Sequence, residues 1–363
     1  MTQEPLYKEA AAAYPFGSEI LSIEPYGGGH INDTYLIRCT SGNYVLQRIN
    51  GFVFAHPDEI MENILGVTHF IADKLAAHGD DPARGTLTVV KTTDGADFYV
   101  DSEGHYWRTT LNIEDTTAFE FADSPEMLVK SGAAFGTFQS MLADYPADTL
   151  HETIPHFHDT PARYHQLEDA IAANKAGRLS EVGPELEFVR ARKADCAILM
   201  DLLEKGDLPL KVTHNDTKMS NVLIDNATGE AVCVIDLDTV MPGLTAFDFG
   251  DSIRAGASTA AEDEVDHTKV HFSLTIFNAY TEGFLSAAGK SLTETEIKTL
   301  PVGAKLMTLE VGMRFLADYL NGDVYFKTKY PQHNLDRARN QFHLVEEMEQ
   351  KWDGMMEIVS AYL

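Results

Sequence analysis

Two short β-branched runs, joined by a turn, interrupt an otherwise helical stretch of the chain. They are "NVLID" (221–225) and "AVCVID" (231–236), and the connecting turn ends at Gly229. This pattern predicts a β-hairpin. The segment before it, "VTHNDTKMS" (212–220), carries polar side chains at regular intervals directly beside apolar strand residues. Such spacing rarely serves packing, so we expect the hairpin to carry the chemistry of the protein.

The chain around the hairpin predicts an α+β fold with two lobes. Strand-like runs are expected at 44–49, 86–91, 96–101 and 106–111, and one helix is expected from Pro57 to Gly79. Helical periodicity predominates at 124–142, 161–176, 184–204, 263–288, 294–320 and 334–363. We therefore predict a small antiparallel sheet with one helix over 1–112. A larger, mainly helical lobe that contains the hairpin is predicted over 113–363.

The charge balance excludes several classes of partner. The chain has 56 acidic and 28 basic residues, a formal net charge of −28, whereas nucleic acids and anionic membranes attract clustered Lys and Arg. A nucleotide stays compatible, because one anion needs only a local pocket of donors and a metal ion. Three cysteines without a C-x-x-C pair, no leader-like N-terminus and no membrane-length apolar run predict a cytoplasmic protein. The composition does not predict an oligomeric state.

The residues around the hairpin form a set suited to phosphoryl transfer. This reaction needs metal ions, a cation on the transferring phosphate and an acceptor for the proton of the incoming hydroxyl. Asp216 can accept that proton and Lys218 can reach the phosphate. Asn221 and Asp236 carry hard oxygen ligands of the kind that Mg²⁺ prefers. We predict Asp216 and Lys218 as catalytic residues and Asn221 and Asp236 as metal ligands.

Neighbouring polar residues are expected to have supporting roles. His214 is expected to pack and hydrogen-bond within the loop rather than to carry a proton. Asp238, two residues after Asp236, is either a further metal ligand or a salt-bridged residue. In "FDFGDSIR", Asp248 and Asp251 lie at helical spacing. They are predicted to support the segment 214–221, which carries the predicted catalytic residues and is called the catalytic loop below.

The order of these residues resembles a known fold. H-x-D-x-K-x-x-N followed by a strand ending in Asp resembles the catalytic and metal-binding segments of the protein-kinase-like fold. "HNDTKMSNVLID…VIDLDTVMPG" is similar to the aminoglycoside phosphotransferase/choline kinase superfamily. The resemblance implies a bilobal kinase-like fold that uses ATP and Mg²⁺. The alternative is a hairpin whose polar ends only cap turns.

A glycine-rich turn is expected to contact the nucleotide. In "PYGGGHINDTYLI" (25–37), Gly27, Gly28 and Gly29 lie between two strand-like runs. Their backbone N–H groups can approach phosphate without hindrance from Cβ. A plain tight turn is the alternative.

The next strand departs from the kinase pattern. Gln47 and Arg48 occupy the place where a phosphate-binding Lys is expected, and strand alternation sends them to opposite faces, so only one can serve. The helical partner of that residue is open between Glu59 and Glu62. At the crossover between the lobes, the backbone near Leu111 and Ile113 can meet an adenine edge, although ordinary hinge backbone has the same pattern.

Seven segments along the chain resemble the N-acetylhexosamine 1-kinases of bacterial hexosamine salvage. They include "IEPYGGGHINDTYL", "HFHDTPARY", "FDFGDSIRAGASTAAEDE" and "GMRFLADYLNGDVYFKTKYPQHNL". The resemblance implies transfer of phosphate to the anomeric hydroxyl of N-acetylglucosamine or N-acetylgalactosamine. Other small-molecule kinases of the same fold, acting on an aminoglycoside, choline or homoserine, are the alternative. A nucleotide-binding pseudokinase is the third hypothesis.

The resemblance also implies a sugar site. Arg314 lies between Glu310 and Asp318 at four-residue intervals on one helix face, so a surface salt-bridge stripe is the alternative to a sugar ligand. Tyr325 is a candidate for stacking on the sugar, or else one more core aromatic. The further substrate-binding candidates are His30, Glu114, Asp115 and Asp216.

Two other clusters receive structural interpretations. "HFHDTPARYH" (156–165) suggests zinc by its histidines, but Pro161 favours a helix that is capped by Asp159 or Thr160. "AEDEVD" (261–266) is expected to form the acidic first turn of a long helix.

Overall fold

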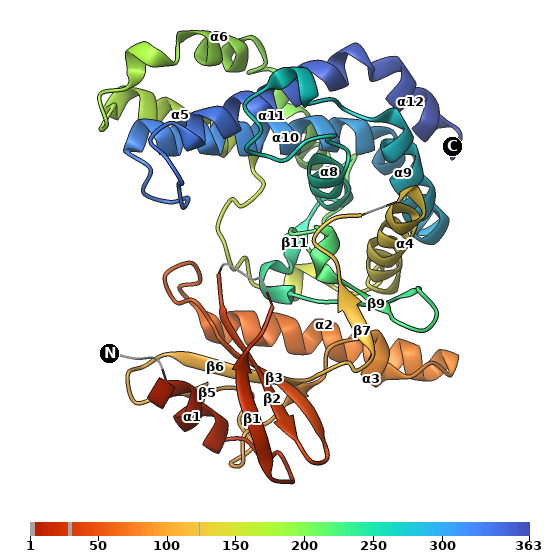
Figure 1. Cartoon of the computed structure of the whole chain (residues 1–363). Coiled ribbons are helices and arrows are strands. Elements are labelled where there is room, and N and C mark those ends of the chain that lie inside the picture. Colours follow the sequence, from red (N-terminus) through yellow and green to blue (C-terminus); the bar gives the residue numbers. More distant parts are fainter. Residues whose placement is uncertain (1–3, 28–30, 123) are drawn as a thin grey trace. The chain divides into compact units, whose positions relative to one another are not determined.

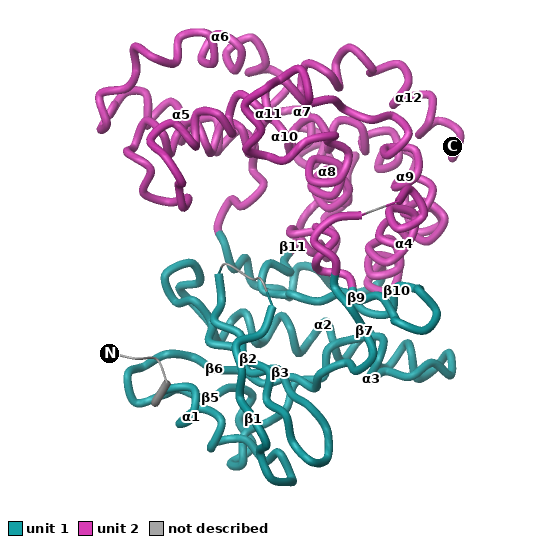
Figure 2. Tube along the Cα trace, in the orientation of Figure 1, with its two compact units in different colours: residues 1–118, 144–154, 223–241 teal, residues 119–143, 155–222, 242–363 magenta. Residues whose placement is uncertain are grey.

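The computed structural model describes residues 4–27, 31–122 and 124–363 (Figure 1). The chain divides into two compact units (Figure 2). The N-terminal unit comprises Met1–Ala118, Asp144–Ile154 and Leu223–Met241. The helical unit comprises Phe119–Ala143, Pro155–Val222 and Pro242–Leu363.

The described part of the N-terminal unit contains a sheet, several helices of which α2 is the longest, and the predicted hairpin. Its elements are α1 (Glu4–Ala12), β1 (Ile20–Pro25), β2 (Asp33–Cys39), β3 (Gly42–Arg48), α2 (Pro57–His78), α3 (Pro82–Gly85), β4 (Val89–Val90), β5 (Tyr99–Val100), β6 (Tyr106–Leu111), β7 (Thr116–Ala118), η1 (Ala147–Thr149), β9 (Val222–Asp225), β10 (Ala231–Val234) and η5 (Leu237–Thr239).

The main sheet is antiparallel, with the order β1-β2-β3-β6-β4 and β5 paired to β6. Its apolar face packs with α1 around Tyr35, Leu46 and Trp107. The strands expected at 86–91 and 96–101 are only two residues long, as β4 and β5. Thr92 explains this, because its N–H and its hydroxyl both bind the carbonyl of Ala96 and close a tight turn.

One side chain of α2 holds two later segments in the N-terminal unit. The buried amide of Asn63 exchanges two hydrogen bonds with the backbone of His151, at 2.8 and 2.9 Å, and donates to the carbonyl of Val240 at 2.9 Å. The hairpin is tied in separately, since β9 pairs with β7 and Arg84 binds Asp225. The carboxylate of Asp225 also accepts the N–H of Thr228 and so stabilises the turn.

The helical unit is built mostly of α-helices. Its elements are α4 (Pro125–Met141), α5 (Thr160–Ala173), η2 (Leu179–Glu181), α6 (Gly183–Ala191), η3 (Asp195–Ala197), α7 (Ile198–Glu204), β8 (Lys211–Thr213), η4 (Met219–Asn221), β11 (Met241–Gly243), which pairs with β8, α8 (Thr245–Gly256), η6 (His267–Lys269), α9 (Leu274–Ala288), η7 (Gly289–Ser291), α10 (Glu294–Asn321), α11 (His333–Gln350) and α12 (Trp352–Ser360).

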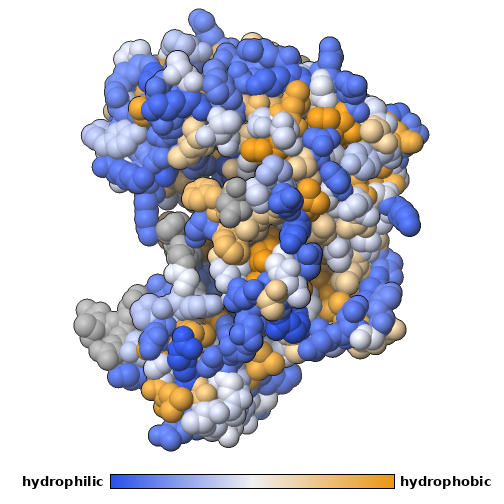
Figure 3. All heavy atoms as spheres, turned by 45° about the vertical axis from the view of Figure 1, so that its right-hand side comes forward, coloured by the Kyte–Doolittle hydropathy of each residue, from blue (hydrophilic) through white to orange (hydrophobic). Residues whose placement is uncertain are grey.

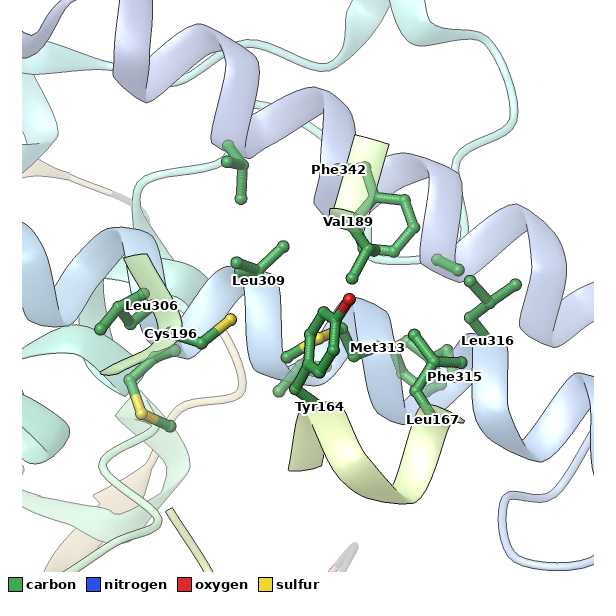
Figure 4. Packing of buried hydrophobic residues seen from close by; sticks show 14 of the residues in the cluster. Tyr164, Leu167, Val189, Cys196, Leu306, Leu309, Met313, Phe315, Leu316 and Phe342 are labelled. Carbon is green, nitrogen blue, oxygen red and sulfur yellow. The ribbon is translucent and has the colours of Figure 1, made fainter. Parts of the chain in front are cut away.

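Helix α10 forms the centre of this unit. It begins with a capping box, in which Thr293 and Glu296 each bind the other's backbone N–H, and it ends at Gly322 in the left-handed conformation. Figure 4 shows its side chains gathered with Tyr164 of α5 and Phe342 of α11 in the main apolar cluster. The expected helix at 294–320 is therefore confirmed with nearly the predicted ends.

The backbones of α8 and α10 approach closely because both helices carry glycine at the crossing. A Cβ on Gly303 would collide with the carbonyl oxygen of Ala246, and one on Gly250 would collide with the carbonyl of Gly303. The backbones of α8 and α10 therefore pack directly against each other.

Two helical predictions are wrong in part. The range 184–204 is divided into α6, η3 and α7. The acidic segment 261–266 does not begin a long helix, since α9 starts only at Leu274. Its carboxylates instead pair with distant cations: Glu262 with Arg254, and Asp263 with Lys329.

Hydrophilic side chains cover much of the face in Figure 3, in keeping with the strongly negative charge. Within the described residues, no helix is both long enough and apolar enough to cross a membrane.

Candidate active site

The catalytic loop follows β8 and is braced by α8. The fully buried carboxylate of Asp248 accepts the N–H groups of His214 and Asn215 at 2.9 and 2.8 Å. Burial raises the pKa of this carboxyl, while the donors around it favour the charged form. Asp251, one turn later, accepts the N–H of Thr217 at 3.0 Å. The supporting role predicted for these two acids is confirmed.

Asp251 is also paired with a buried cation. Burial would raise the pKa of its carboxyl, but the guanidinium of Arg254 at 3.0 Å and other donors hold that pKa below its ordinary value. The loop backbone is thus held by two carboxylates from one helix face.

His214 acts as a strut within the loop. It is fully buried, its ring lies edge-on to Phe135 and Phe138, and its Nδ1 accepts the N–H of Asp216 at 3.2 Å. The packing role predicted for His214 is therefore confirmed.

The three predicted polar residues of this loop lie together. Oδ2 of Asp216 accepts hydrogen bonds from Lys218 Nζ at 2.8 Å and from Asn221 Nδ2 at 3.1 Å. Its Oδ1 has no hydrogen-bond donor in the part of the chain that the structure describes, and the side chain is one-third exposed. The arrangement leaves one carboxylate oxygen to receive a proton from an incoming group.

The amide of Asn221 is oriented in a way that fits a metal ligand. Its nitrogen is bound to both the carbonyl and the carboxylate of Asp216, so its oxygen is directed elsewhere and accepts no hydrogen bond from any described residue. Asp236 belongs to the N-terminal unit and has a left-handed backbone, with φ of 62°. No group of three or more His, Cys, Asp or Glu side chains suited to a metal occurs among the described residues. A hard cation here would therefore draw on an amide, water or substrate oxygens as well.

In the N-terminal unit, Gln47 and Arg48 differ sharply in their partners. Arg48 forms an ion pair with Asp33 on β2. The amide oxygen of Gln47 accepts two hydrogen bonds, at 3.0 and 2.9 Å, from Arg108, which lies opposite it on β6. Glu62 binds His151 at 2.6 Å rather than either strand residue.

Arg108 is a residue that the sequence analysis missed. Its side chain is almost fully buried, and besides Gln47 it pairs with Asp238, which also accepts a hydrogen bond from Asn32 at 2.6 Å. The salt-bridged role considered for Asp238 is thus the one observed. The available signal was an arginine in the middle of "YWRTTL", a strand with an otherwise uncharged pattern.

The glycine turn lies partly outside the described residues, and so do the predicted residues Gly28, Gly29 and His30. Gly27 has a φ of 76°, in the left-handed region that favours glycine.

At the predicted crossover, some backbone groups are already engaged. The N–H of Leu111 binds Thr88, and the carbonyl of Ile113 accepts the hydroxyl of Thr116 at 2.7 Å. The side chains of Glu114 and Asp115 are exposed in the N-terminal unit.

The acids on either side of Arg314 do not pair with it. Glu310 is fully buried and binds His158 and Thr160, both at 3.1 Å. The carboxylate of Asp318 accepts the backbone N–H groups of Val324, Tyr325 and Phe326 at 2.9 to 3.0 Å. The alternative of a surface salt-bridge stripe is therefore wrong. Glu310 is buried in the core, and Asp318 orders the loop after α10.

Arg314 lies among aromatic rings instead. Its Cζ is 5.6 Å from the ring centres of Phe157 and Phe326 and 5.9 Å from that of Tyr325. Tyr325 is 55% exposed, so it is not a core aromatic. Burial lowers the pKa of nearby Arg163, and the charge of Arg314 lowers it further. No carboxylate of the described residues forms an ion pair with Arg314.

The histidine-rich segment before α5 forms a helix start. Asp159 caps α5 by accepting the N–H of Ala162 at 3.0 Å. His158 is buried, whereas His156 and His165 are exposed and each pairs with a nearby acid. The capping role is confirmed for Asp159.

Comparisons with known proteins agree with this chemistry. The family model APH, a phosphotransferase enzyme family, matches residues 22–283, which is well over half of the chain. An aminoglycoside phosphotransferase from Alicyclobacillus acidocaldarius is similar in structure, with a TM-score of 0.63 at 13% identity, covering 98% of this chain and 96% of that one. A choline/ethanolamine kinase family protein from Mesorhizobium loti has a TM-score of 0.58 at 14% identity, covering 99% of each chain.

An amicoumacin kinase in complex with AMP-PNP and Ca²⁺ has a TM-score of 0.57 at 16% identity and covers 97% of this chain and 94% of that one. At such identities the likeness shows the fold alone. It confirms the predicted α+β, kinase-like fold.

Proposed function

The chain belongs to the phosphotransferase enzyme family, and on that basis we propose that it is an ATP- and Mg²⁺-dependent kinase of the anomeric hydroxyl of N-acetylhexosamines. The observation that carries this proposal is the environment of Arg314, a guanidinium set among three rings with no ion-paired carboxylate among the described residues. The positive charge of Arg314 disfavours a cationic acceptor such as an aminoglycoside or choline, whereas a neutral sugar can accept hydrogen bonds from the guanidinium and stack on the rings.

The catalytic roles follow from the contacts of the loop. Asp216 accepts the proton of the sugar hydroxyl through Oδ1, because Oδ2 is engaged by Lys218 and Asn221. Lys218 is close enough to Asp216 to place its charge on the transferring phosphate. Asn221 and Asp236 would hold the divalent ion, which would supply positive charge to the phosphate groups when bound.

The nucleotide side relies on a charge from β6. Gln47 has no charge of its own, but Arg108 lies against it and is tied to Asp238. We assign to Arg108 the positive charge that orders the nucleotide phosphates and the metal-binding segment that begins at Asp236. The glycine turn that contains Gly27, and the backbone at Leu111 and Ile113, complete this assignment.

On the acceptor side, Arg314 and Tyr325 hold the sugar, with His30, Glu114 and Asp115 as further candidates. The activity is assigned to the cytoplasm, where the three buried free cysteines stay reduced.

ATP consumption with N-acetylglucosamine, N-acetylgalactosamine, choline and kanamycin tests the proposal. We expect consumption with the two sugars only and an acid-labile sugar phosphate as the product. The methyl glycosides of the same sugars are the matched control, because their anomeric oxygen cannot accept phosphate. Turnover of choline or kanamycin alone, or of the methyl glycosides, would refute the proposal, and no turnover with any acceptor would favour a pseudokinase.

Substitution of Arg314 tests the residue on which the acceptor assignment rests. Arg314→Met is expected to raise KM for the sugar about tenfold or more, because charged hydrogen bonds to the sugar are lost. KM for ATP should stay the same. An unchanged KM for the sugar would remove Arg314 from the site.

A further inference from the structure

His158 lies between the proposed acceptor helix α10 and the catalytic loop, within the helical unit. Its Nδ1 is 3.1 Å from a carboxylate oxygen of Glu310, and its Nε2 is 3.3 Å from the carbonyl oxygen of Asn215. Both neighbours are hydrogen-bond acceptors, and either ring nitrogen of a histidine can carry the donating proton. The ring therefore lies in position to link α10 with the loop that contains Asp216.

Glu310 is held in place by its neighbours. Glu310 is fully buried, and its second carboxylate oxygen accepts the hydroxyl of Thr160 at 3.1 Å. A buried carboxylate is unfavourable unless hydrogen-bond donors or charges compensate it. The side chains of His158 and Thr160 both lie within hydrogen-bonding distance of Glu310. The rings of Phe157 and Phe247, at 4.3 and 5.5 Å, hold the imidazole between them.

The peptide group that His158 contacts is held from both ends. The N–H of Asn215 binds Asp248, and its carbonyl faces His158. Asn215 has a φ of 64°, in the left-handed region, which Asn adopts more readily than most residues other than glycine. Asp216 is the next residue, so the direction of its side chain depends on how this peptide is oriented.

We propose that His158, held by Glu310, is a positioning residue that directs Asp216 toward the hydroxyl bound near Arg314. This inference rests on the proposed function, since it assumes that Asp216 is the base and that α10 carries the acceptor site. Glu310 and Arg314 are one helical turn apart, so the same helix that holds the acceptor sets the catalytic loop through His158.

Two substitutions separate the two hydrogen bonds of the ring. The amide of Gln places a donor near the position of Nε2, and the shorter Asn places one near Nδ1. His158→Gln therefore keeps the hydrogen bond to Asn215, and His158→Asn keeps the one to Glu310. Both remove the ring and its packing, so they serve as controls for each other.

We expect His158→Asn to lower kcat about 10- to 100-fold, since small displacements of a catalytic group have effects of this size. His158→Gln should retain most of kcat, within about threefold. KM for ATP should be the same in both variants, and their thermal midpoints should fall by similar amounts. Equal kcat in the two variants, or kcat that simply follows the thermal midpoint, would overturn the proposal.

A crystal structure of each variant separates this inference from the proposed function. We expect a rotated Asn215 peptide in His158→Asn and an unrotated one in His158→Gln, whichever acceptor the enzyme uses. If the sugars are not substrates but another hydroxyl compound is, the kinetic comparison is made with that compound. An unrotated peptide in His158→Asn would overturn the positioning role even if the sugars are phosphorylated.

Discussion

The catalytic loop of the helical unit and the strand pair β3–β6 of the N-terminal unit both bring polar side chains into contact. They differ in how far apart the contacting residues are in the sequence. In the loop, Asp216, Lys218 and Asn221 come from six consecutive residues and bind one another directly. In the strand pair, Gln47 and Arg108 are 61 residues apart in sequence and meet because β3 and β6 are antiparallel neighbours. A motif is visible in the sequence where the site is local, and invisible where the partners meet only across a sheet.

The largest effect is expected at the loop. Asp216→Asn keeps the size of the side chain but cannot accept a proton at pH 7. We expect kcat to fall by about 10² to 10⁴-fold, the usual contribution of a general base. Affinity for ATP, measured by calorimetry, should change little. Normal turnover would show that Asp216 is not the general base.

The strand pair is expected to respond next, at Arg108. Arg108→Met leaves the buried carboxylate of Asp238 without its cation, so we expect a loss of about 3 to 5 kcal/mol in unfolding free energy. KM for ATP should rise about tenfold or more if this cation orders the phosphates. Urea unfolding and initial rates at varied ATP measure the two effects.

The matched control is Arg48→Met on the neighbouring position of β3. Its ion pair with Asp33 is partly exposed, with side chains 23% and 39% accessible. Exposed ion pairs of this kind contribute about 0.2 to 1 kcal/mol to the free energy of unfolding. KM for ATP should also stay within about twofold. A larger rise with Arg48→Met than with Arg108→Met would assign the phosphate contact to Arg48 instead.

A smaller effect on stability is expected from the brace of the loop. In Asp248→Asn, one oxygen becomes an NH₂ group that faces a backbone N–H. An unsatisfied buried group of this kind costs about 1 to 3 kcal/mol. Because the affected N–H groups belong to His214 and Asn215, kcat should fall as well as the free energy of unfolding.

Asp101→Asn provides the comparison in the N-terminal unit. Asp101 is also buried and accepts the N–H groups of Glu103 and His105 and the indole N–H of Trp107. We expect a similar loss of stability with an unchanged kcat. If both variants lose kcat equally, the loss reflects general destabilisation and not the catalytic loop.

The parts of the fold that depend on residues close together in the sequence were predicted well. The helix of α10, the hairpin turn at Asp225 and the N-cap at Asp159 each depend on residues within a few positions of one another. The helix expected from Asp263 was wrong for the opposite reason. Its acids satisfy helical N-terminal preferences, but ion pairs with Arg254 and Lys329 hold the segment in an irregular conformation.

The residues around Arg314 show the same limit of prediction from sequence. Glu310, Arg314 and Asp318 share a helical face in the sequence, which favours ion pairs along that face. The structure gives the two acids other partners, a buried imidazole and the backbone of the next loop. Spacing along one helix cannot reveal which acids are drawn away by residues from other elements.

The chain's own spacing was enough to predict that Asp216, Lys218 and Asn221 lie together, because they fall within six consecutive positions. The tertiary structure alone brought Arg108 to Gln47, His158 to Asn215, and Asn63 to Val240. Each of these contacts joins residues that are tens to hundreds of positions apart. Their pairing follows from sheet register and helix packing, which leave few buried polar groups without a partner. Register and packing are set by the whole fold and not by any local pattern.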